Sequence, residues 1–110
     1  MINIASRKEG SATVVQVSGR IDVETAPGFQ QACLEVARGA EKLVVLDLGG
    51  VQYISSSGLR SLLVIGKELQ ERGGLLRLAN LTATVRQLFE QSRFYSLFQC
   101  FDSAEKAAEG

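Results

Sequence analysis

The sequence contains no histidine and only two cysteines among its 110 residues. Without histidine, the chain lacks the usual general base of serine and cysteine hydrolases. It also lacks the ligands of most zinc sites, because two isolated cysteines cannot complete one. Cys33 and Cys100 lie far apart in the sequence without a metal-ligand spacing, so we expect two buried free thiols. We therefore predict no catalytic residue, no metal site and no cofactor.

An excess of charge of either sign is also absent, since the chain has 12 basic and 12 acidic residues. No basic stripe is visible, so binding to nucleic acid is not expected. The longest apolar runs are short, such as Leu62–Ile65, whereas a membrane span needs about 20 apolar residues. Met1–Gly10 lacks the apolar stretch of a signal peptide. We therefore expect a cytoplasmic protein that does not insert into membranes.

Short apolar segments of strand length recur along the chain. Apolar residues make up 45% and charged residues 22% of the sequence, which are ordinary values for a folded domain. Leu43–Leu48 is a nearly continuous apolar run, typical of a strand covered on both faces. Gly49–Gly50 is expected to turn the chain after it, and Lys8–Ser11 to form an earlier turn. The predicted strands are Ile2–Ile4, Thr13–Val17, Leu43–Leu48, Leu75–Ala79 and Leu97–Phe101.

Polar cap residues followed by apolar residues at helical spacing predict helices between these strands. Thr25 and Thr82 are the expected caps of the first and third helices. Asp102 or Ser103 begins a terminal helix, in which Glu105 is placed to close a capping box on Asp102. One apolar face of the second helix is formed by Leu59, Leu62, Leu63, Gly66 and Leu69.

The order of these segments predicts the architecture. Strands that alternate with helices imply parallel pairing in one sheet. No linker, internal repeat or low-complexity stretch interrupts the pattern. We therefore expect a single α/β domain over residues 1–110.

The most informative stretch is Asp47–Arg60, with the sequence DLGGVQYISSSGLR. A central strand ends here, and three serines and a glycine open a helix. Serine is among the best helix N-caps, worth about 1 kcal/mol over alanine, and the simplest interpretation is one cap beside two solvated serines. One cap needs only one serine, however, so further hydroxyls remain at an uncrowded helix end, where a kinase could reach them.

The segment DLGGVQYISSSGLR resembles the signature of bacterial anti-sigma factor antagonists, the STAS-domain proteins. Two further segments are similar to the family in the same order: Val17–Thr25 (VSGRIDVET) and Val85–Ser92 (VRQLFEQS), which Leu97–Phe98 follows. The resemblance covers almost the whole chain, and the serine segment is its most specific part. It implies a single STAS-type domain, with a mixed four- to five-stranded sheet and about four helices.

The resemblance also implies which residues carry the function. The family's phosphorylated serine falls on Ser56, and Gly58 matches the motif glycine. Ser57 matches the small residue before that glycine, and Ser55 stands where the family often has aspartate. Because that departure allows a register shifted by one, Ser57 and Ser55 stay open as alternative phosphorylation sites. Asp22 matches an acidic residue on the family's kinase-facing surface, with a solvated carboxylate or a turn cap as the alternative.

For the other residues around the motif we expect mainly structural or solvent-exposed positions. Arg60 is expected to be exposed, where it would touch a partner or the incoming phosphate donor, or be simply solvated. Asp47 is expected to have a structural role at the end of its strand. The apolar residues near the motif are expected in the core: Tyr53, Ile54, Leu59, Leu62 and Leu63.

The function that the resemblance implies is partner switching. The unphosphorylated protein would bind an anti-sigma factor, a serine kinase of the histidine-kinase-like ATPase type, and thereby free a sigma factor. That kinase would phosphorylate the serine and end the complex, and a PP2C-type phosphatase would restore it. The partner-binding residues would be Asp22, Ser55, Ser56, Ser57, Gly58 and Arg60.

Two other function classes are distinguishable from this one. A STAS domain also serves as a regulatory module in other partner-switching, stress-complex or transport systems, and neighbouring genes would discriminate between these. A hydrolase would need the GxSxG frame around its serine and a histidine base, and the chain has neither.

Overall fold

The computed structural model describes residues 2–39 and 41–109, so residues 1, 40 and 110 of the predicted domain 1–110 lie outside the described part. The strands are β1 (Ile2–Glu9), β2 (Ala12–Ile21), β3 (Leu43–Ile54), β4 (Leu75–Ala79) and β5 (Gln99–Phe101). The helices are α1 (Ala26–Ala37), α2 (Ser56–Glu71), α3 (Ala83–Gln91), the short 3₁₀ helix η1 (Tyr95–Leu97) and α4 (Ala104–Ala108).

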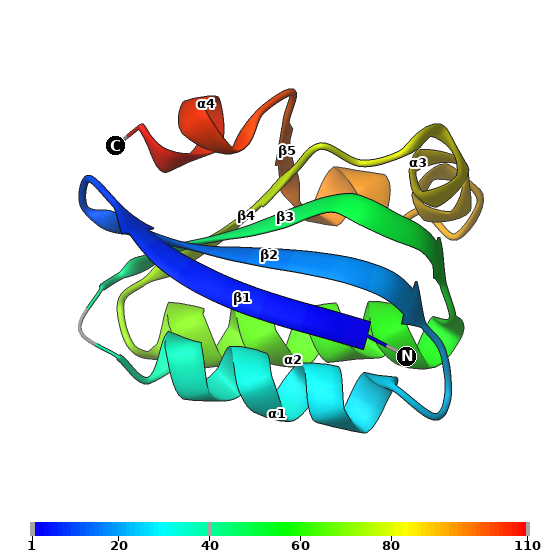
Figure 1. The fold of residues 1–110 in the computed structure, drawn as a ribbon, viewed down its shortest axis with the longest axis horizontal. Coiled ribbons are helices and arrows are strands. Elements are labelled where there is room, and N and C mark those ends of the chain that lie inside the picture. The colour runs from blue at the N-terminus through cyan, green and yellow to red at the C-terminus, as the bar shows by residue number, and fades with distance from the viewer. Residues whose placement is uncertain (1, 40, 110) are drawn as a thin grey trace.

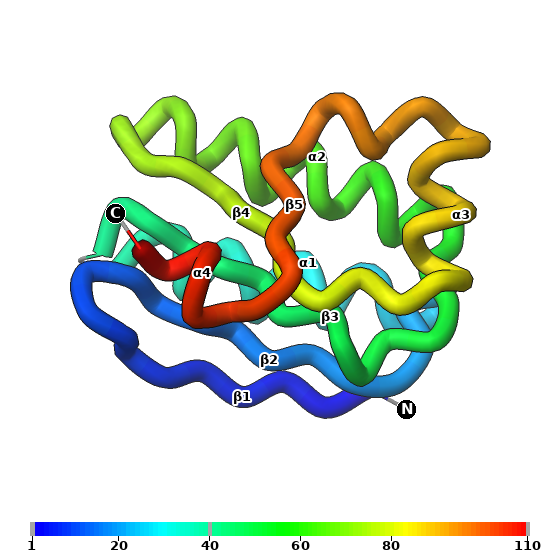
Figure 2. Tube along the Cα trace, turned by 90° about the horizontal axis from the view of Figure 1, so that it is seen from above, coloured from blue at the N-terminus to red at the C-terminus, as the bar shows by residue number. Residues whose placement is uncertain are grey.

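The strands form one five-stranded mixed sheet in the order β1-β2-β3-β4-β5. β1 pairs antiparallel with β2, and the other neighbouring strands pair in parallel. Helices α1 and α2 lie side by side on one face of this sheet, and α4 lies on the other (Figure 1). From above, α4 and β5 are seen over the sheet, with α3 at one end (Figure 2). The predicted α/β architecture is confirmed.

Apolar side chains fill the space on both faces of the sheet, as the run Leu43–Leu48 predicted. Val44 and Leu46 belong to the main core, which α1 and α2 cover. Val45 points to the opposite face, into a second apolar cluster that α4 covers. That second cluster consists of Ala12, Val14, Val45, Ala79, Ala104, Ala107 and Ala108. The first half of β3 is therefore buried on both faces, whereas Gly49, Gly50 and Gln52 in its second half are exposed.

One predicted turn lies within its expected range but is shorter, and a second predicted turn is wrong. β1 continues to Glu9, and a two-residue turn at Gly10–Ser11 replaces the predicted turn Lys8–Ser11. β3 runs through Gly49–Gly50 instead of turning there, because β2 pairs with it as far as Ile54. Gly50 allows β2 and β3 to approach each other closely here, since a Cβ on Gly50 would lie 2.6 Å from Ser18 Cβ.

Smaller corrections concern the ends of elements and two residues expected in the core. Tyr53 is only half-buried, and the Arg20 guanidinium lies over its ring at 4.6 Å from the centroid. Leu63 was expected in the core but is 40% exposed, because it lies at the outer edge of the apolar face of α2. The predicted strand Leu97–Phe101 shrinks to Gln99–Phe101, since Leu97 belongs to η1. Ser103 caps α4 by accepting a hydrogen bond from the N–H of Lys106. The predicted capping box on Asp102 is therefore wrong by one residue.

Candidate functional site at the start of helix α2

The site is built where two neighbouring parallel strands end. Ile21 at the end of β2 pairs with Ile54 at the end of β3. The N–H of Ser55 then donates to the carbonyl oxygen of Ile21 over 2.7 Å. This bond links the ends of the two strands directly. Asp22 follows Ile21 and Ser55 follows Ile54, so these two residues lie in adjacent loops. The structure therefore brings together the two segments that carried the predicted site.

The three serines occupy different positions at the helix start. Ser55 is the N-cap in an extended conformation, and its hydroxyl accepts a hydrogen bond from the N–H of Gly58 at 3.2 Å. Its carbonyl oxygen accepts the first helical bond, from the N–H of Leu59 at 2.9 Å. Ser56 is the first residue of α2 and is exposed, whereas Ser57 is half-buried. Of the three, Ser56 therefore offers the most accessible hydroxyl.

Gly58 fixes the helix against the strand ends. It is buried, and a Cβ at this position would lie 2.6 Å from both Ile21 Cγ2 and Ile54 Cγ1. Real Cβ atoms essentially never approach other heavy atoms under 3.0 Å, so only glycine allows this close packing. The structure thus gives the motif glycine a positioning role, and its contact with a partner stays a prediction.

Asp22 caps the turn between β2 and α1. Its Oδ1 accepts hydrogen bonds from the N–H groups of Glu24 and Thr25, both at 3.0 Å. The pKa of Asp22 is held below its ordinary value. The largest cause is the hydrogen bond from the backbone of Thr25, and the bond from Glu24 and the charge of Arg20 add to it. The carboxylate is therefore ionised at neutral pH and stands in the loop beside Ser55.

Thr25 precedes α1 as predicted, but its hydroxyl does not cap the helix. It donates to the carbonyl oxygen of Arg20 at 2.7 Å and accepts from the N–H of Asp22 at 2.9 Å. The side chain thus closes the preceding loop instead of the helix end. The predicted capping bond is wrong, because the loop residues compete successfully for the same hydroxyl.

A hollow of about 630 Å³ between α1 and α2 adjoins the serines. Ser57 and Arg60 line it from α2, and Arg60 is exposed as predicted. Val23 and Val64 also line it, although they are 70% and 42% exposed. Sequence reasoning missed both valines. The available signal was that Val64 lies off the apolar face of its helix and that Val23 sits in a polar loop.

Asp47 lies apart from these groups and supports the backbone. Its Oδ1 accepts hydrogen bonds from the N–H of Gly49 at 3.0 Å and from Asn80 Nδ2 at 3.1 Å. The carboxylate thereby ties β3 to the residue that follows β4. This arrangement agrees with the structural role expected for it.

The expectation of buried free thiols is confirmed for Cys33 and only partly for Cys100. Cys33 is fully buried, and burial raises the pKa of its thiol to about 12. Cys100 is free but only half-buried, and burial raises the pKa of its thiol as well.

Over residues 2–39 and 41–109, no three or more Asp, Glu or Cys side chains gather in a way that could hold a metal ion. None of the helices in the same ranges has the length and apolar composition to cross a membrane.

The chain belongs to the STAS domain family, whose model matches residues 3–107. It is 48% identical over 68 residues to BtrV of Bordetella bronchiseptica, which is named provisionally as an anti-sigma factor antagonist. That alignment covers 62% of this chain and only 59% of BtrV, less than two thirds of its length. The anti-sigma-B factor antagonist of Bacillus subtilis is 30% identical over 90 residues, which are 81% of each chain.

The fold agrees with solved structures of the same class. The crystal structure of an anti-sigma factor antagonist from Mycobacterium paratuberculosis superposes with a TM-score of 0.87 at 25% identity. The superposition covers 97% of this chain and 91% of that one. The family resemblance found in the sequence is therefore confirmed.

Proposed function

We propose that this chain is an anti-sigma factor antagonist whose complex with its anti-sigma factor is controlled by phosphorylation of Ser56. The observation that carries the proposal is the exposed Ser56 hydroxyl at the first position of a helix that neighbouring groups hold in place. The names of the relatives from Bordetella bronchiseptica and Bacillus subtilis support the same class of function.

The geometry favours Ser56 over its two neighbours as the modified residue. The Ser55 hydroxyl is engaged as the helix cap, so its phosphorylation would break that bond. Ser57 is half-buried and lines the hollow between α1 and α2. A kinase needs an accessible hydroxyl that can move into line with ATP, and Ser56 provides it without loss of a structural bond.

A phosphate at Ser56 would change the surface and leave the fold intact. It adds about −1.5 to −2 charges at pH 7, next to the partial positive charge of a helix N-terminus. That position favours the phosphorylated fold by a few tenths to about 1 kcal/mol. At an interface, in contrast, burial of such a group without a partner is strongly unfavourable. Because each 1.4 kcal/mol weakens binding about tenfold, a modest penalty suffices to end the complex.

The surrounding residues define the surface that the partner would contact. Ser55 and Ser57 flank Ser56, and Asp22 follows Ile21, whose carbonyl oxygen accepts from the N–H of Ser55. Arg60 lines the hollow together with Ser57, and Gly58 packs the helix start against Ile21 and Ile54. We expect the partner to contact Asp22, Ser55, Ser57, Gly58 and Arg60 as well as Ser56.

The partner would be an anti-sigma factor that is also a serine kinase of the histidine-kinase-like ATPase type. A PP2C-type phosphatase would remove the phosphate. In this scheme the chain acts in the cytoplasm as substrate and ligand, without catalysis or cofactor of its own.

The test is phosphorylation by a candidate kinase encoded beside this chain, with Mg-ATP and mass spectrometric mapping. We expect one phosphate on Ser56, none on Ser56→Ala, and normal modification of the control Ser6→Ala, which changes an exposed serine of β1 outside the proposed contact surface. Calorimetry should then show that the phosphorylated chain binds the kinase at least a hundredfold more weakly, while circular dichroism stays unchanged. Modification of a different serine, or equal affinity of both forms, would contradict the proposal.

A further inference from the structure

Arg60 lies one helical turn after Ser56 on the same side of α2. Residues four apart on a helix are surface neighbours, with their Cβ atoms about 5–6 Å apart. At about 100° per residue, Arg60 is turned from Ser56 by only about 40° around the helix axis. The turn is toward Val64, which lines the hollow between α1 and α2 together with Arg60. Arg60 therefore stands between the exposed serine and the hollow.

The direction of helical side chains brings Arg60 toward the serines. Every Cα–Cβ bond of a helix is tilted toward the N-terminus, so a long side chain covers the turn that precedes its own residue. For Arg60 that turn contains Ser56 and Ser57, at the start of α2. The guanidinium ends a long flexible stem, and it can reach a group attached to the Ser56 hydroxyl without a change in the backbone.

No acidic side chain lies next to Arg60 along α2. The first turn of the helix carries no acidic residue. Among the described residues that line the hollow, none is a carboxylate either. The helix neighbours three and four positions away are uncharged: Ser56, Ser57, Leu63 and Val64. A negative charge can therefore arise beside Arg60 on this helix through modification of a serine.

The fold does not use Arg60 as it uses other arginines. Arg77, for example, is held by the side chain of Gln99 and by two carbonyl oxygens of α4. Within the part of the chain that the structure describes, no salt bridge involves Arg60. The Asp22 carboxylate accepts from the N–H groups of its own turn, and the cation that helps to lower its pKa is Arg20. The Arg60 guanidinium is therefore available to a new anion.

We propose that Arg60 receives the phosphate of Ser56, so that after phosphorylation its guanidinium leaves the hollow and donates to the phosphate oxygens. Arginine and phosphate form charge-assisted hydrogen bonds that are often bidentate. An anion one turn N-terminal to a cation is also the favourable order of such a pair on a helix. The inference rests on the proposed function, since it takes Ser56 as the modified residue, and it adds how the surface around that residue is regulated.

The pairing makes one modification change two parts of the contact surface. The phosphate adds negative charge at the start of α2, and the same event withdraws a positive charge from the hollow. A partner that contacts the hollow of the unphosphorylated form would then meet a changed charge at both places. The switch needs only a side-chain movement, in agreement with a fold that stays intact.

The test uses the full chain with phosphoserine introduced at position 56 during translation, so it needs no kinase. A ³¹P NMR titration gives the second pKa of the phosphate, which a neighbouring cation lowers because it favours the dianion. We expect this pKa to be lower in the otherwise unchanged chain than in Arg60→Gln by about 0.3–0.7 pH units, as for an exposed ion pair. Arg60→Lys should recover only part of the difference, because an ammonium lacks the planar fork of donors.

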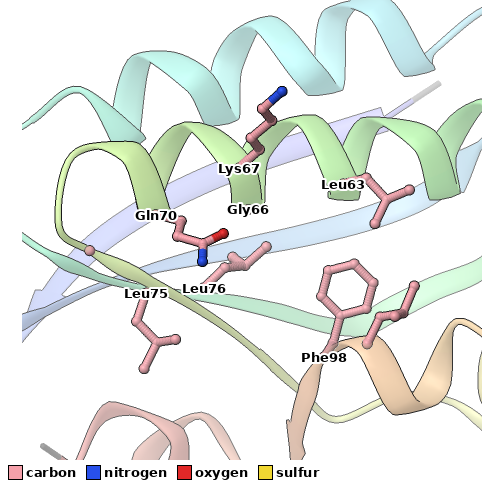
Figure 3. Close-up of a pocket in the computed structure, with 9 residues that line it drawn as sticks. Leu63, Gly66, Lys67, Gln70, Leu75, Leu76 and Phe98 are labelled. Atoms are coloured by element: carbon pink, nitrogen blue, oxygen red, sulfur yellow. The ribbon is translucent and has the colours of Figure 1, made fainter.

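The matched control is Lys67→Gln, which removes one positive charge from the same helix. Lys67 is exposed and lies eleven positions after Ser56, or about 16 Å along the helix axis. In Figure 3 its side chain rises from α2 away from the apolar groove lined by Leu63, Leu76 and Phe98. Because this distance exceeds the screening length in ordinary salt, the phosphate pKa should change by less than about 0.1 pH units.

Circular dichroism should show the same fold for all variants, since Arg60 and Lys67 are exposed. Equal phosphate pKa values with and without Arg60 would overturn the proposal. An equal rise in Lys67→Gln would overturn it too, because the effect would then belong to the net charge of the chain. Modification of another serine by the kinase would contradict the proposed function but would leave this titration unaffected, so the two failures can be told apart.

Discussion

Gly58→Ala is the substitution whose effect follows most directly from the geometry. The new methyl group would lie 2.6 Å from both Ile21 Cγ2 and Ile54 Cγ1, whereas carbon atoms are normally about 3.5–4.0 Å apart. Both isoleucines are buried, and β-branched side chains have little freedom at χ1. They therefore cannot yield by about 1 Å without a shift of the backbone.

The magnitude combines two opposing effects. Overpacking of a well-packed core typically costs about 1–3 kcal/mol, while glycine to alanine in a helix typically gains about 0.5–1 kcal/mol. We expect a net loss of about 1–2 kcal/mol, or roughly 5–15 °C in Tm for a domain of this size. Urea unfolding followed by circular dichroism measures the loss as a lower midpoint at unchanged slope.

Two other helical glycines serve as matched controls. A Cβ on Gly28 would meet nothing within 4 Å, and one on Gly66 would make only ordinary contacts. Gly28→Ala and Gly66→Ala should therefore leave the free energy of unfolding unchanged or raise it by up to about 1 kcal/mol. If Gly58→Ala proves as stable as these two variants, the close packing does not hold the start of α2 as argued above.

Three further predictions concern the serine cap, the Asp22 turn and the thiols. Ser55→Ala should lower the free energy of unfolding by about 1 kcal/mol through loss of the cap, and Ser57→Ala by less than about 0.5 kcal/mol; the reverse order in urea unfolding would refute the capping assignment. Because the folded-state pKa of Asp22 is lowered from 3.8, its contribution is present above that pH and is lost as pH falls through the folded-state pKa. Acidification should therefore destabilise the wild type more than Asp22→Asn, and parallel pH profiles would exclude this contribution. Ellman's reagent should react with Cys100 in the native protein but with Cys33 only after unfolding, because Cys33 is fully buried; equal native rates would contradict the burial.

The elements that were predicted well are those with a strong local pattern. The run Leu43–Leu48 has few alternatives to a strand buried on both faces. One serine was expected to cap the next helix, and the structure shows that this serine is Ser55. The predictions failed where contacts between residues far apart in the sequence determine the structure. The local sequence Gly49–Gly50 is typical of a turn, but pairing with β2 extends β3 through these two residues.

The site was predictable in its serines and less so in its surroundings. The motif placed Ser56 at the helix start, but nothing local indicates that Gly58 touches Ile21, which lies 37 residues earlier. The exposure of Val23 and Val64 depends on how α1 packs beside α2. Such information is absent from local periodicity, because it arises only when the two helices meet on the sheet.

The short helix α4 has a practical consequence for preparing this protein. Its three alanines shield Val14 and Val45, and Arg77 anchors its end through the carbonyl oxygens of Ala107 and Glu109. Five residues are too few to stay helical alone in water, so the sheet supports α4 as much as α4 shields the sheet. Removal of the segment after Asp102 would expose the apolar side chains of Val14 and Val45 to solvent and promote aggregation. A binding assay would then report the aggregation as a loss of partner binding. Affinity tags and fluorophores are therefore better appended beyond Glu109 than substituted for the tail.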